Sequence, residues 1–291
     1  MYRFLFPIKI HIWGGLGSQL YGLALAYDLA EIRSSTRIKL VFHSSGVTKR
    51  QPNIDKSLVP FSVNFVDDFT TISSNSHSIS SELDQKSFTK IIKFLIKKFL
   101  LKTGLVIDAN NDSSFSKIRF WTFEIRGHYS LRSIRINTLE KIFKTLFYSE
   151  LKNPTLAQDL AIHFRLGDLL YLTNKSPTDV NRFINILSDF KDSNADSIIA
   201  VFSDSPDQAK KIVLHGLADY QQSQINFPIA DLIESVRSMV STRFFIATSS
   251  KISEWALLFR ELNVERTLSW IPIEMMEFSQ RNRLSKIRYY N

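Results

Sequence analysis

The N-terminal residues place the strongest constraint on the fold of this chain. A β-prone run, Ile8–Trp13, leads into a turn at residues 14–19 that holds three glycines. Apolar residues then recur at helical spacing as far as Ile32, and a second β-prone run follows at residues 38–42. A strand, a glycine loop, a helix and a strand in this order are typical of one half of a Rossmann-like domain.

The rest of the chain continues the alternation of strands and helices. Further strands are predicted at residues 160–164, 197–202, 225–227, 244–247 and 268–272. Helices are predicted at residues 86–102, 138–147, 177–190 and 229–240, after Pro206, and from the end of residues 248–250 through Leu262. Such alternation predicts parallel sheets with crossover helices. We therefore expect an α/β protein of two Rossmann-like domains that face each other across a cleft. The domains are placed at residues 1–154 and 155–291, with a linker at 150–157 and a helical tail at 281–290 that can pack back on the first domain.

Composition restricts the classes of function. The 291 residues include no cysteine, which excludes disulfides, a thiolate nucleophile and a cysteine-ligated metal. A formal charge of +9 points to an anionic partner, which can be a nucleic acid, an anionic lipid surface or a phosphorylated small molecule. The apolar residues 1–12 are interpreted as a strand rather than a signal peptide, so a cytoplasmic protein is expected. No nucleic-acid motif with interleaved aromatic residues is present, and nucleic acid is not the expected partner.

Three polar residues follow the predicted strand at 160–164, where ligands of open α/β sheets bind. They are His163, Arg165 and Asp168. The guanidinium of Arg165 offers paired donors that fit a phosphate, His163 can hydrogen-bond a nucleotide or a reacting hydroxyl, and Asp168 can orient Arg165. The alternative is a structural ion pair beside a buried histidine.

Two more predicted strands end in small polar residues ahead of a helix. Ser203 and Asp204 follow one, and residues 248–250 follow the other. Hydroxyls and helix-start N–H groups there can bind phosphate oxygens, although ordinary helix capping explains each instance equally well.

Other candidate sites have plainer explanations. The glycine loop lacks the third glycine of the dinucleotide fingerprint, because Leu20 stands there, and His43 rather than an acidic residue ends the next strand. NAD is therefore not expected. Neither a DxD triplet nor clustered histidines are present, so no metal is expected. The lysine-rich helix at 86–102 can lie on an anionic membrane or pack on the sheet.

Five segments resemble, in the same order, the motifs of the bacterial α-1,2-fucosyltransferase family, which is glycosyltransferase family 11-like and part of the wider fucosyltransferase superfamily. Residues 14–20 resemble G-G-L-G-N-Q-L, and residues 127–130 lie where the family has a G-Y-F-Q-S-like segment. Residues 163–168 resemble H-x-R-R-G-D, residues 202–204 resemble F-S-D-D, and residues 250–255 resemble the serine–tryptophan signature. The departures are Ser18, Leu166, Ser205, Lys251, Ile252 and Glu254.

The resemblance implies a GT-B-like fold and an inverting, metal-independent transfer of L-fucose from GDP-fucose, with no cofactor. The acceptor would be a galactose-type hydroxyl, often lipid-linked, in bacterial surface polysaccharide or O-antigen assembly; GDP-colitose is an alternative donor. The catalytic residues implied are Arg165, His163 and Asp168. The donor-binding residues implied are Gly15, Gly17, Gln19, Ser203, Asp204, Asp231 (or Glu234), Ser249, Ser250 and Ser253. Glu124 and His128 are acceptor-side candidates, and with Asp168 they are candidates for the general base.

Overall fold

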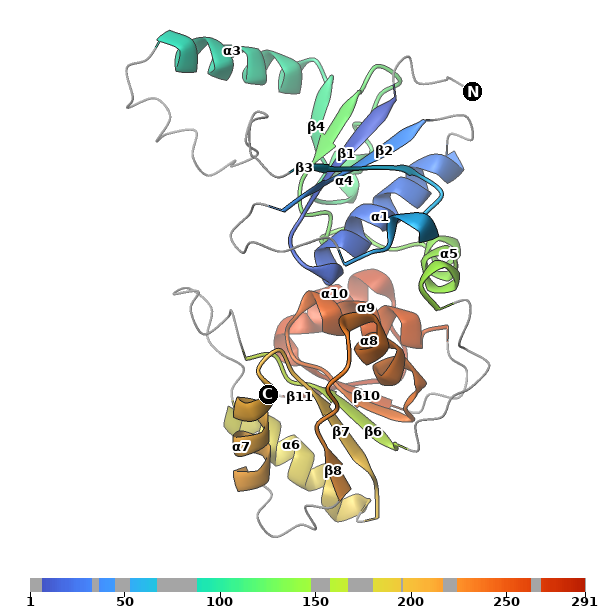
Figure 1. Ribbon diagram of the computed structural model, residues 1–291, viewed down its shortest axis with the longest axis vertical. Helices are drawn as coiled ribbons and strands as arrows, with labels where there is room; N and C mark the ends of the chain where they lie inside the picture. The colour runs from blue at the N-terminus through green and yellow to red at the C-terminus, as the bar shows by residue number, and fades with distance from the viewer. Residues whose placement is uncertain are drawn as a thin grey trace. The chain divides into compact units, whose positions relative to one another are not determined.

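The computed structural model of the chain describes residues 7–32, 37–44, 53–66, 88–147, 158–166, 180–194, 196–216, 224–262 and 268–290. The chain divides into two compact units, Met1–Thr145 and Leu146–Asn291. Each unit contains one parallel sheet with helices (Figure 1), which confirms the predicted α/β class with two Rossmann-like domains. The predicted linker at 150–157 lies outside the described residues, and the cleft between the domains stays a prediction.

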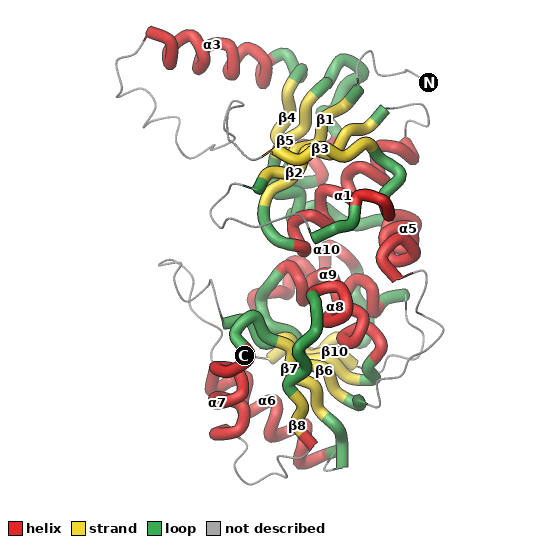
Figure 2. The backbone as a smooth tube through the Cα atoms, in the orientation of Figure 1, coloured by secondary structure: helices red, strands yellow, loops and turns green. Residues whose placement is uncertain are grey.

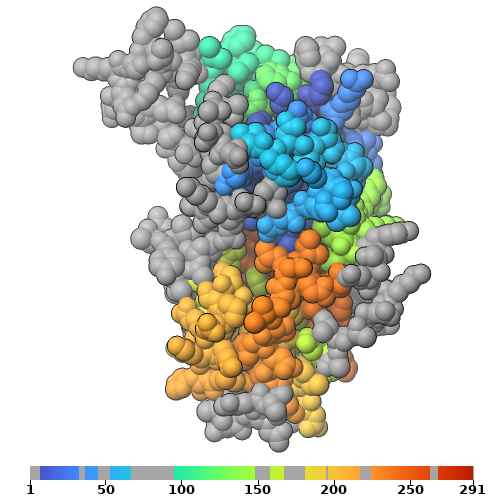
Figure 3. Space-filling view, in the orientation of Figure 1, coloured from blue at the N-terminus to red at the C-terminus, as the bar shows by residue number. Residues whose placement is uncertain are grey.

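The first unit has a five-stranded sheet in the order β3-β2-β1-β5-β4, with every pair parallel. Its strands are β1 (Ile8–Trp13), β2 (Ile38–His43), β3 (Ser62–Val66), β4 (Val106–Asp108) and β5 (Glu124–Arg126). Its helices are α1 (Leu16–Ile32), the 3-10 turn η1 (Lys56–Leu58), α3 (Phe88–Lys102), α4 (Asp112–Phe115) and most of α5 (Ile136–Phe147). Residues 53–66 lie on the face of this unit seen in Figure 3, in light blue.

Two glycines set the approach of α1 to the sheet. Gly14 has a φ of 88°, which only glycine adopts easily, and it turns the chain from β1 into the helix. Gly22 lies where α1 meets β1, because a methyl group there would come within 2.5 Å of the Ile12 side chain. These two glycines therefore allow α1 to pack closely against the sheet, whether or not a ligand also binds at the loop.

A buried carboxylate joins α1 to the segment that starts α5. Asp28 is 1% exposed, and its oxygens accept hydrogen bonds from Arg132 at 2.5 Å, from Arg135 at 2.9 Å and from the Thr138 hydroxyl. Arg132 is itself buried. Removing one partner of such a pair leaves an uncompensated charge in a medium of low dielectric constant, so this group holds α1 and α5 in one arrangement.

The second unit has a six-stranded parallel sheet in the order β11-β10-β9-β6-β7-β8. Its strands are β6 (Leu160–His163), β7 (Ile199–Phe202), β8 (Ile225–Asn226), β9 (Phe244–Ile246), β10 (Leu268–Pro272) and β11 (Ile287–Tyr290). Its helices are α6 (Val180–Ser193), α7 (Pro206–Gly216), α8 (Leu232–Ser241), α9 (Lys251–Arg260), the 3-10 turn η4 (Ile273–Met275) and α10 (Met276–Asn282).

The helices of the second unit cover both faces of its sheet. Figure 2 shows α6 and α7 on one face and α8, α9 and α10 on the other. Leu160 and Ile162 pack with α6 and α7 in one apolar cluster. Because side chains alternate along a strand, Ala161 and His163 point to the opposite face, toward α9. Because helices pack on both faces of the sheet, side chains on both faces of β6 are buried. This explains why the β6 sequence is almost continuously apolar.

On that second face, Arg260 of α9 hydrogen-bonds to the end of α8, to the residues before β9 and to β10. It is 1% exposed and donates to the carbonyl oxygens of Met239, Thr242 and Arg243 and to the Ser269 hydroxyl at 2.7–3.0 Å. These acceptors lie at the end of α8, before β9 and in β10. One guanidinium thus satisfies carbonyl oxygens that the end of a helix leaves without partners.

The prediction of a helical tail at residues 281–290 is wrong. Helix α10 ends at Asn282, its C-cap Arg283 has a φ of 53°, and Lys286 also has a positive φ. Residues 287–290 then pair with β10 as β11, where the Tyr290 hydroxyl donates to the Ala247 carbonyl oxygen at 2.6 Å. Pairing with a neighbouring strand outweighs the local helical preference. The packing of this tail on the first domain stays a prediction.

Candidate functional site

Polar side chains gather where the second sheet changes direction. From β6 the chain builds β7 and β8 on one side and β9, β10 and β11 on the other, so β6 and β9 flank the topological switch point. In open α/β sheets, ligands bind outside the carboxyl ends of the strands at this point. The residues that end β6 and those that follow β7 and β9 therefore define the candidate site.

His163 ends β6 and faces the start of α9. Its Nδ1 lies 2.8 Å from the Ser253 hydroxyl and 3.1 Å from the Ser250 hydroxyl. Burial, aided by the charge of Arg165 and opposed by Asp204, lowers the pKa of His163 to about 4. His163 is therefore neutral at pH 7 and can donate a hydrogen bond to a ligand without adding a charge.

Ser250 is the N-cap of α9. Its hydroxyl accepts a hydrogen bond from the Ser253 backbone N–H at 3.1 Å, and Ser249 beside it is exposed. Ser253 itself is buried. Of the three predicted donor-binding serines at the start of α9, Ser249 is exposed, and Ser250 and Ser253 contact His163. This is the positive end of a helix, where anions bind well.

Thr248 joins β9 to the residues after β6. Its hydroxyl donates to the His163 carbonyl oxygen at 2.8 Å and lies 3.3 Å from the Arg165 backbone nitrogen. Sequence reasoning named Thr248 only as part of a strand end. In the structure Thr248 is distinguished from the neighbouring Ser249 and Ser250 by its complete burial.

Arg165 and Asp204 lie at the same edge of the sheet. Nε of Arg165 is 3.8 Å from Oδ2 of Asp204, and Oδ1 of Asp204 accepts from the Leu166 N–H at 2.8 Å. The Arg165 side chain is 20% exposed, so it can reach a ligand in solution. Asp204 is therefore the carboxylate that the structure shows beside Arg165, whereas Asp168, to which the sequence assigned the orienting role, lies outside the described residues.

The other predicted residues of this unit act in helix starts. The Ser203 hydroxyl accepts from the Ser205 N–H at 3.1 Å, ahead of α7. Asp231 is the N-cap of α8 and accepts from the Glu234 N–H at 2.8 Å, while Glu234 pairs with Arg237. These contacts give Asp231 a structural role whether or not a nucleotide base binds there.

In the first unit, the glycine loop is tied down by Gln19. Its amide nitrogen donates to the Gly14 carbonyl oxygen at 3.0 Å and its carbonyl oxygen accepts from the Asn53 N–H at 2.8 Å. Gln19 is 2% exposed, which assigns it to positioning the loop. Gly15 accepts the first hydrogen bonds of α1, and Gly17 is buried within the helix.

The two acceptor-side candidates differ in environment. His128 is exposed, and its N–H donates to the Asn110 side chain. Glu124 is buried between His11 and Arg126. Burial raises the pKa of Glu124, but the hydrogen bond from His11 and the charge of Arg126 outweigh it and hold this pKa at about 2. Glu124 is therefore a fixed anion and a poor proton acceptor by itself.

Sequence reasoning missed two histidines near Glu124. His11 lies within β1 and His43 ends β2, and both are buried. A polar residue inside an apolar strand, two positions before Trp13, was the available signal.

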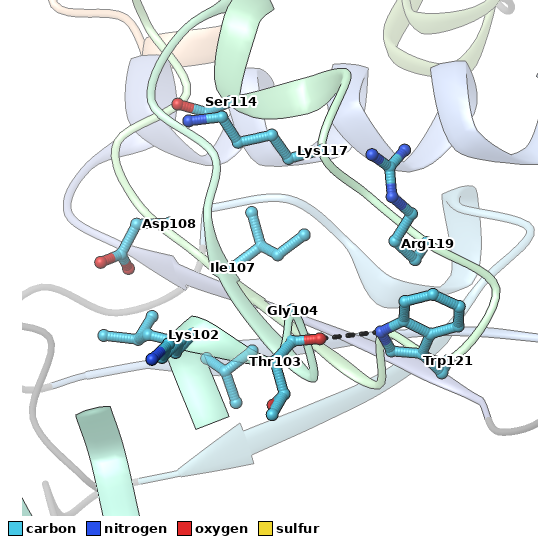
Figure 4. Close-up of a pocket in the computed structure, with 11 residues that line it drawn as sticks. Lys102, Thr103, Gly104, Ile107, Asp108, Ser114, Lys117, Arg119 and Trp121 are labelled. Carbon is cyan, nitrogen blue, oxygen red and sulfur yellow. Dashed lines mark hydrogen bonds between the residues drawn. The ribbon is translucent and has the colours of Figure 1, made fainter. Parts of the chain in front are cut away.

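A pocket of about 430 Å³ opens beside β4 in the first unit (Figure 4). Its lining includes Lys102, Lys117, Arg119, Asp108 and Trp121, whose indole N–H donates to the Thr103 carbonyl oxygen. Burial raises the pKa of Asp108, although the charges of Arg126 and Lys97 oppose this. Cations, a carboxylate and an indole together suit a polar ligand such as a sugar or an anion.

The described residues hold neither a cluster of metal-binding side chains nor a membrane-spanning helix. Among these residues, no group of three or more histidine or acidic side chains could hold a metal ion, and the metal-independent reaction stays a prediction. Within the same residues, no helix has the length and apolar character needed to cross a bilayer.

No family model matches the chain, and no curated protein matches it. Among solved structures, POFUT1 in complex with GDP is similar at 15% identity and a TM-score of 0.47, covering 91% of this chain and 98% of that one. The Escherichia coli heptosyltransferase WaaC with ADP is similar at 12% identity and a TM-score of 0.43, covering 91% and 87%. The glycosyl transferase family 9 protein from Veillonella parvula is similar at 14% identity and a TM-score of 0.41, covering 94% and 81%. At these values the chemistry of this chain has to be argued from its own residues.

Proposed function

We propose that this protein is an inverting, metal-independent glycosyltransferase that uses a GDP-linked 6-deoxyhexose, with L-fucose as the first candidate and colitose as the alternative. The observation that carries this proposal is the cluster of His163, Arg165, Thr248 and Ser250 at the switch point of the second sheet. A guanidinium, hydroxyls and a helix N-terminus are groups that bind a diphosphate. The order of the five motifs supports the fucosyltransferase assignment.

In this proposal the second unit binds the nucleotide sugar. Arg165 contacts the diphosphate and stabilises the charge that develops as GDP leaves, a role that needs preorganised donors rather than covalent chemistry. Asp204 holds the guanidinium in orientation, and neutral His163 contributes a hydrogen bond. The first unit binds the acceptor. The acceptor is a galactose-type hydroxyl on an oligosaccharide or on a lipid-linked sugar, in surface polysaccharide or O-antigen assembly.

Thermal denaturation with GDP tests the nucleotide site. GDP at about 100 times its dissociation constant should stabilise the protein by about 2.7 kcal/mol, and Arg165→Ala should remove most of this stabilisation. Incubation with GDP-L-fucose and GDP-colitose, with release of GDP as the readout, then identifies the donor. Stabilisation by a single-stranded oligonucleotide but not by GDP would favour the alternative of a nucleic-acid-binding protein. A shift with NAD(H) in place of GDP would favour an oxidoreductase.

We also infer that α3 rests on the anionic inner face of the cytoplasmic membrane. Leu95, Ile96 and Phe99 of this helix are 48–62% exposed, which is unusual for large apolar side chains, and Lys98 and Lys102 stand among them. Apolar side chains beside lysines match an interface with acidic headgroups, where each lysine adds about 1 kcal/mol of attraction.

Cosedimentation with lipid vesicles tests this surface. The protein should bind vesicles that contain phosphatidylglycerol and bind pure phosphatidylcholine vesicles much less. Phe99→Ser should weaken partitioning by about tenfold, because burial of the ring is lost. Ile136→Ser, which alters an exposed apolar side chain at the start of α5, serves as the matched control. Equal binding of the wild type and Phe99→Ser would rule out α3 as the contact.

A further inference from the structure

Three cationic side chains line the pocket beside β4 in the first unit. Lys102 is the last residue of α3, and Lys117 and Arg119 belong to the segment between α4 and β5. Figure 4 shows Lys117 and Arg119 along one side of the pocket and Lys102 and Trp121 along the other. All three cations are exposed, so a ligand from solution can reach them. Every residue of the lining belongs to the first unit.

Positive charge exceeds negative charge in this pocket. The lining holds Lys102, Lys117 and Arg119 against one acidic residue, Asp108. Within the part of the chain that the structure describes, no ion pair joins any of the three cations to a carboxylate. Charges of one sign along a concave surface raise the local concentration of ions of the opposite sign. The lining therefore predicts an anionic ligand.

Two hydrogen bonds hold the walls of the pocket together before any ligand binds. The Trp121 indole N–H donates to the Thr103 carbonyl oxygen at 2.9 Å, and the Thr122 hydroxyl donates to the Gly104 carbonyl oxygen at 2.7 Å. Gly104 turns the chain from α3 toward β4 with a φ of 73°, a value that favours glycine. The pocket is thus preorganised, which lowers the entropic cost of binding a ligand.

The end of α3 beside the pocket offers an anion little repulsion. A helix C-terminus is negative because its last carbonyl oxygens lack partners within the helix. Here Thr103 donates to the Phe99 carbonyl oxygen at 2.9 Å through both its N–H and its hydroxyl, and the Gly104 N–H donates to the Leu101 carbonyl oxygen at 3.3 Å. The ammonium of Lys102 in the last turn adds positive charge at the same place.

The mixture of groups indicates a phosphate ester that also carries hydroxyl groups. Lysine and arginine donate the charge-assisted hydrogen bonds that suit phosphate oxygens. Burial raises the pKa of Asp108, against the charges of Arg126 and Lys97, and this weakens its repulsion of an anion. The Asp108 oxygens can accept a hydrogen bond from a hydroxyl group, and the indole of Trp121 offers apolar surface to the carbon atoms of a sugar or of glycerol.

We propose that this pocket binds a polyol phosphate, with the phosphate held by Lys102, Lys117 and Arg119 and a hydroxyl group held by Asp108. The headgroup of a lipid such as phosphatidylglycerol and a free sugar phosphate both present these groups. The site belongs to the first unit and is distinct from the nucleotide site proposed in the second. It does not rest on the proposed glycosyl transfer.

Fluorine NMR of the full chain, labelled with 5-fluorotryptophan, tests the site directly. The chain has four tryptophans, and Trp121→Phe identifies the resonance of the one that lines the pocket. Glucose 1-phosphate at about 10 mM, ten times a Kd of about 1 mM, should shift this resonance. Glucose without the phosphate should not, and a shift as large with glucose would overturn the proposal. Arg165→Ala should leave the shift at Trp121 unchanged, because the second unit takes no part in it.

A second ester distinguishes the two sources of the phosphate. Dihexanoyl phosphatidylglycerol, kept below its micelle concentration, presents the lipid headgroup, and glucose 1-phosphate presents the free sugar phosphate. The ester with the lower Kd at Trp121 identifies the source. Dihexanoyl phosphatidylcholine should give no shift, because its headgroup carries a cation and no hydroxyl group. The absence of a Trp121 shift with both phosphate esters would overturn the proposal.

Substitutions assign the shift to the cations. Lys117→Gln and Arg119→Gln should each raise the Kd about tenfold or more, because each removes a hydrogen bond from a charged group. Lys144→Gln removes one positive charge from an exposed position on α5 and is the matched control, which should keep the wild-type Kd. Wild-type Kd values for both pocket variants would show that these cations do not hold the phosphate. Since this measurement needs no GDP, failure of GDP to bind would overturn the proposed function and leave the polyol phosphate site standing.

Discussion

Asp28→Ala is expected to lower the free energy of unfolding of the first unit by about 3–5 kcal/mol. The carboxylate accepts hydrogen bonds from Arg132, Arg135 and Thr138, and without it the buried guanidinium of Arg132 keeps its charge but loses its counter-ion. The loss therefore exceeds that of a typical surface ion pair severalfold. Equilibrium urea denaturation of the full chain, followed by circular dichroism, measures the change.

Glu31→Ala is the matched control for this experiment. Glu31 lies one helical turn after Asp28 and pairs with Arg135 and Lys141, but the side chains of this group are 30–46% exposed. Exposed pairs are worth little because water screens them. The control should leave the free energy of unfolding close to the wild-type value. An equal loss for both variants would show that the buried guanidinium of Arg132 does not depend on Asp28.

Arg165→Lys is expected to lower the transfer rate by about 100- to 1000-fold while the protein stays folded. An ammonium keeps the positive charge but cannot present two parallel N–H groups to a diphosphate. The loss should appear mainly in kcat with the GDP-sugar donor, because the charge on the leaving phosphate develops during the reaction. Steady-state kinetics with GDP-L-fucose and lactose measure it.

Arg288→Lys provides a comparison within the same unit. This arginine is exposed on β11, and the exchange alters the same functional group away from β6. It should leave kcat and the GDP-dependent thermal shift unchanged. Near-normal turnover of Arg165→Lys would mean that Arg165 acts as a point charge at most, and the bidentate contact with phosphate would have to be abandoned.

The strands could be predicted from the sequence wherever they formed long apolar runs. Ile8–Trp13, Leu160–His163 and Leu268–Pro272 are examples, and all three are strands in the structure. The short strands β4 and β5 were not found, because Glu124 and Arg126 interrupt the apolar pattern of β5. Such a strand exists through pairing with β1 and β4, which a local pattern does not report.

The candidate site was predictable only in part, for a related reason. Polar residues at strand ends can be recognised from the sequence, and His163, Arg165 and Ser250 were found in this way. Which of them contact one another depends on strand order. Strands β6 and β9 are neighbours in the sheet although their first residues, Leu160 and Phe244, are 84 positions apart in the sequence. The contacts of His11 with Glu124 and with His43 depend in the same way on the order of β5, β1 and β2.

The Thr248 hydroxyl, which bridges the backbone on either side of Phe164, has a consequence for the energetics of binding. It joins His163 and Arg165, at the end of β6, to the turn after β9, and the Ser253 hydroxyl adds a hydrogen bond with His163. A ligand that binds such a surface loses its own translational and rotational entropy, but the hydrogen-bonded surface loses little conformational entropy. Tight binding to this edge of the sheet would then be accompanied by only a small entropic penalty from the protein itself.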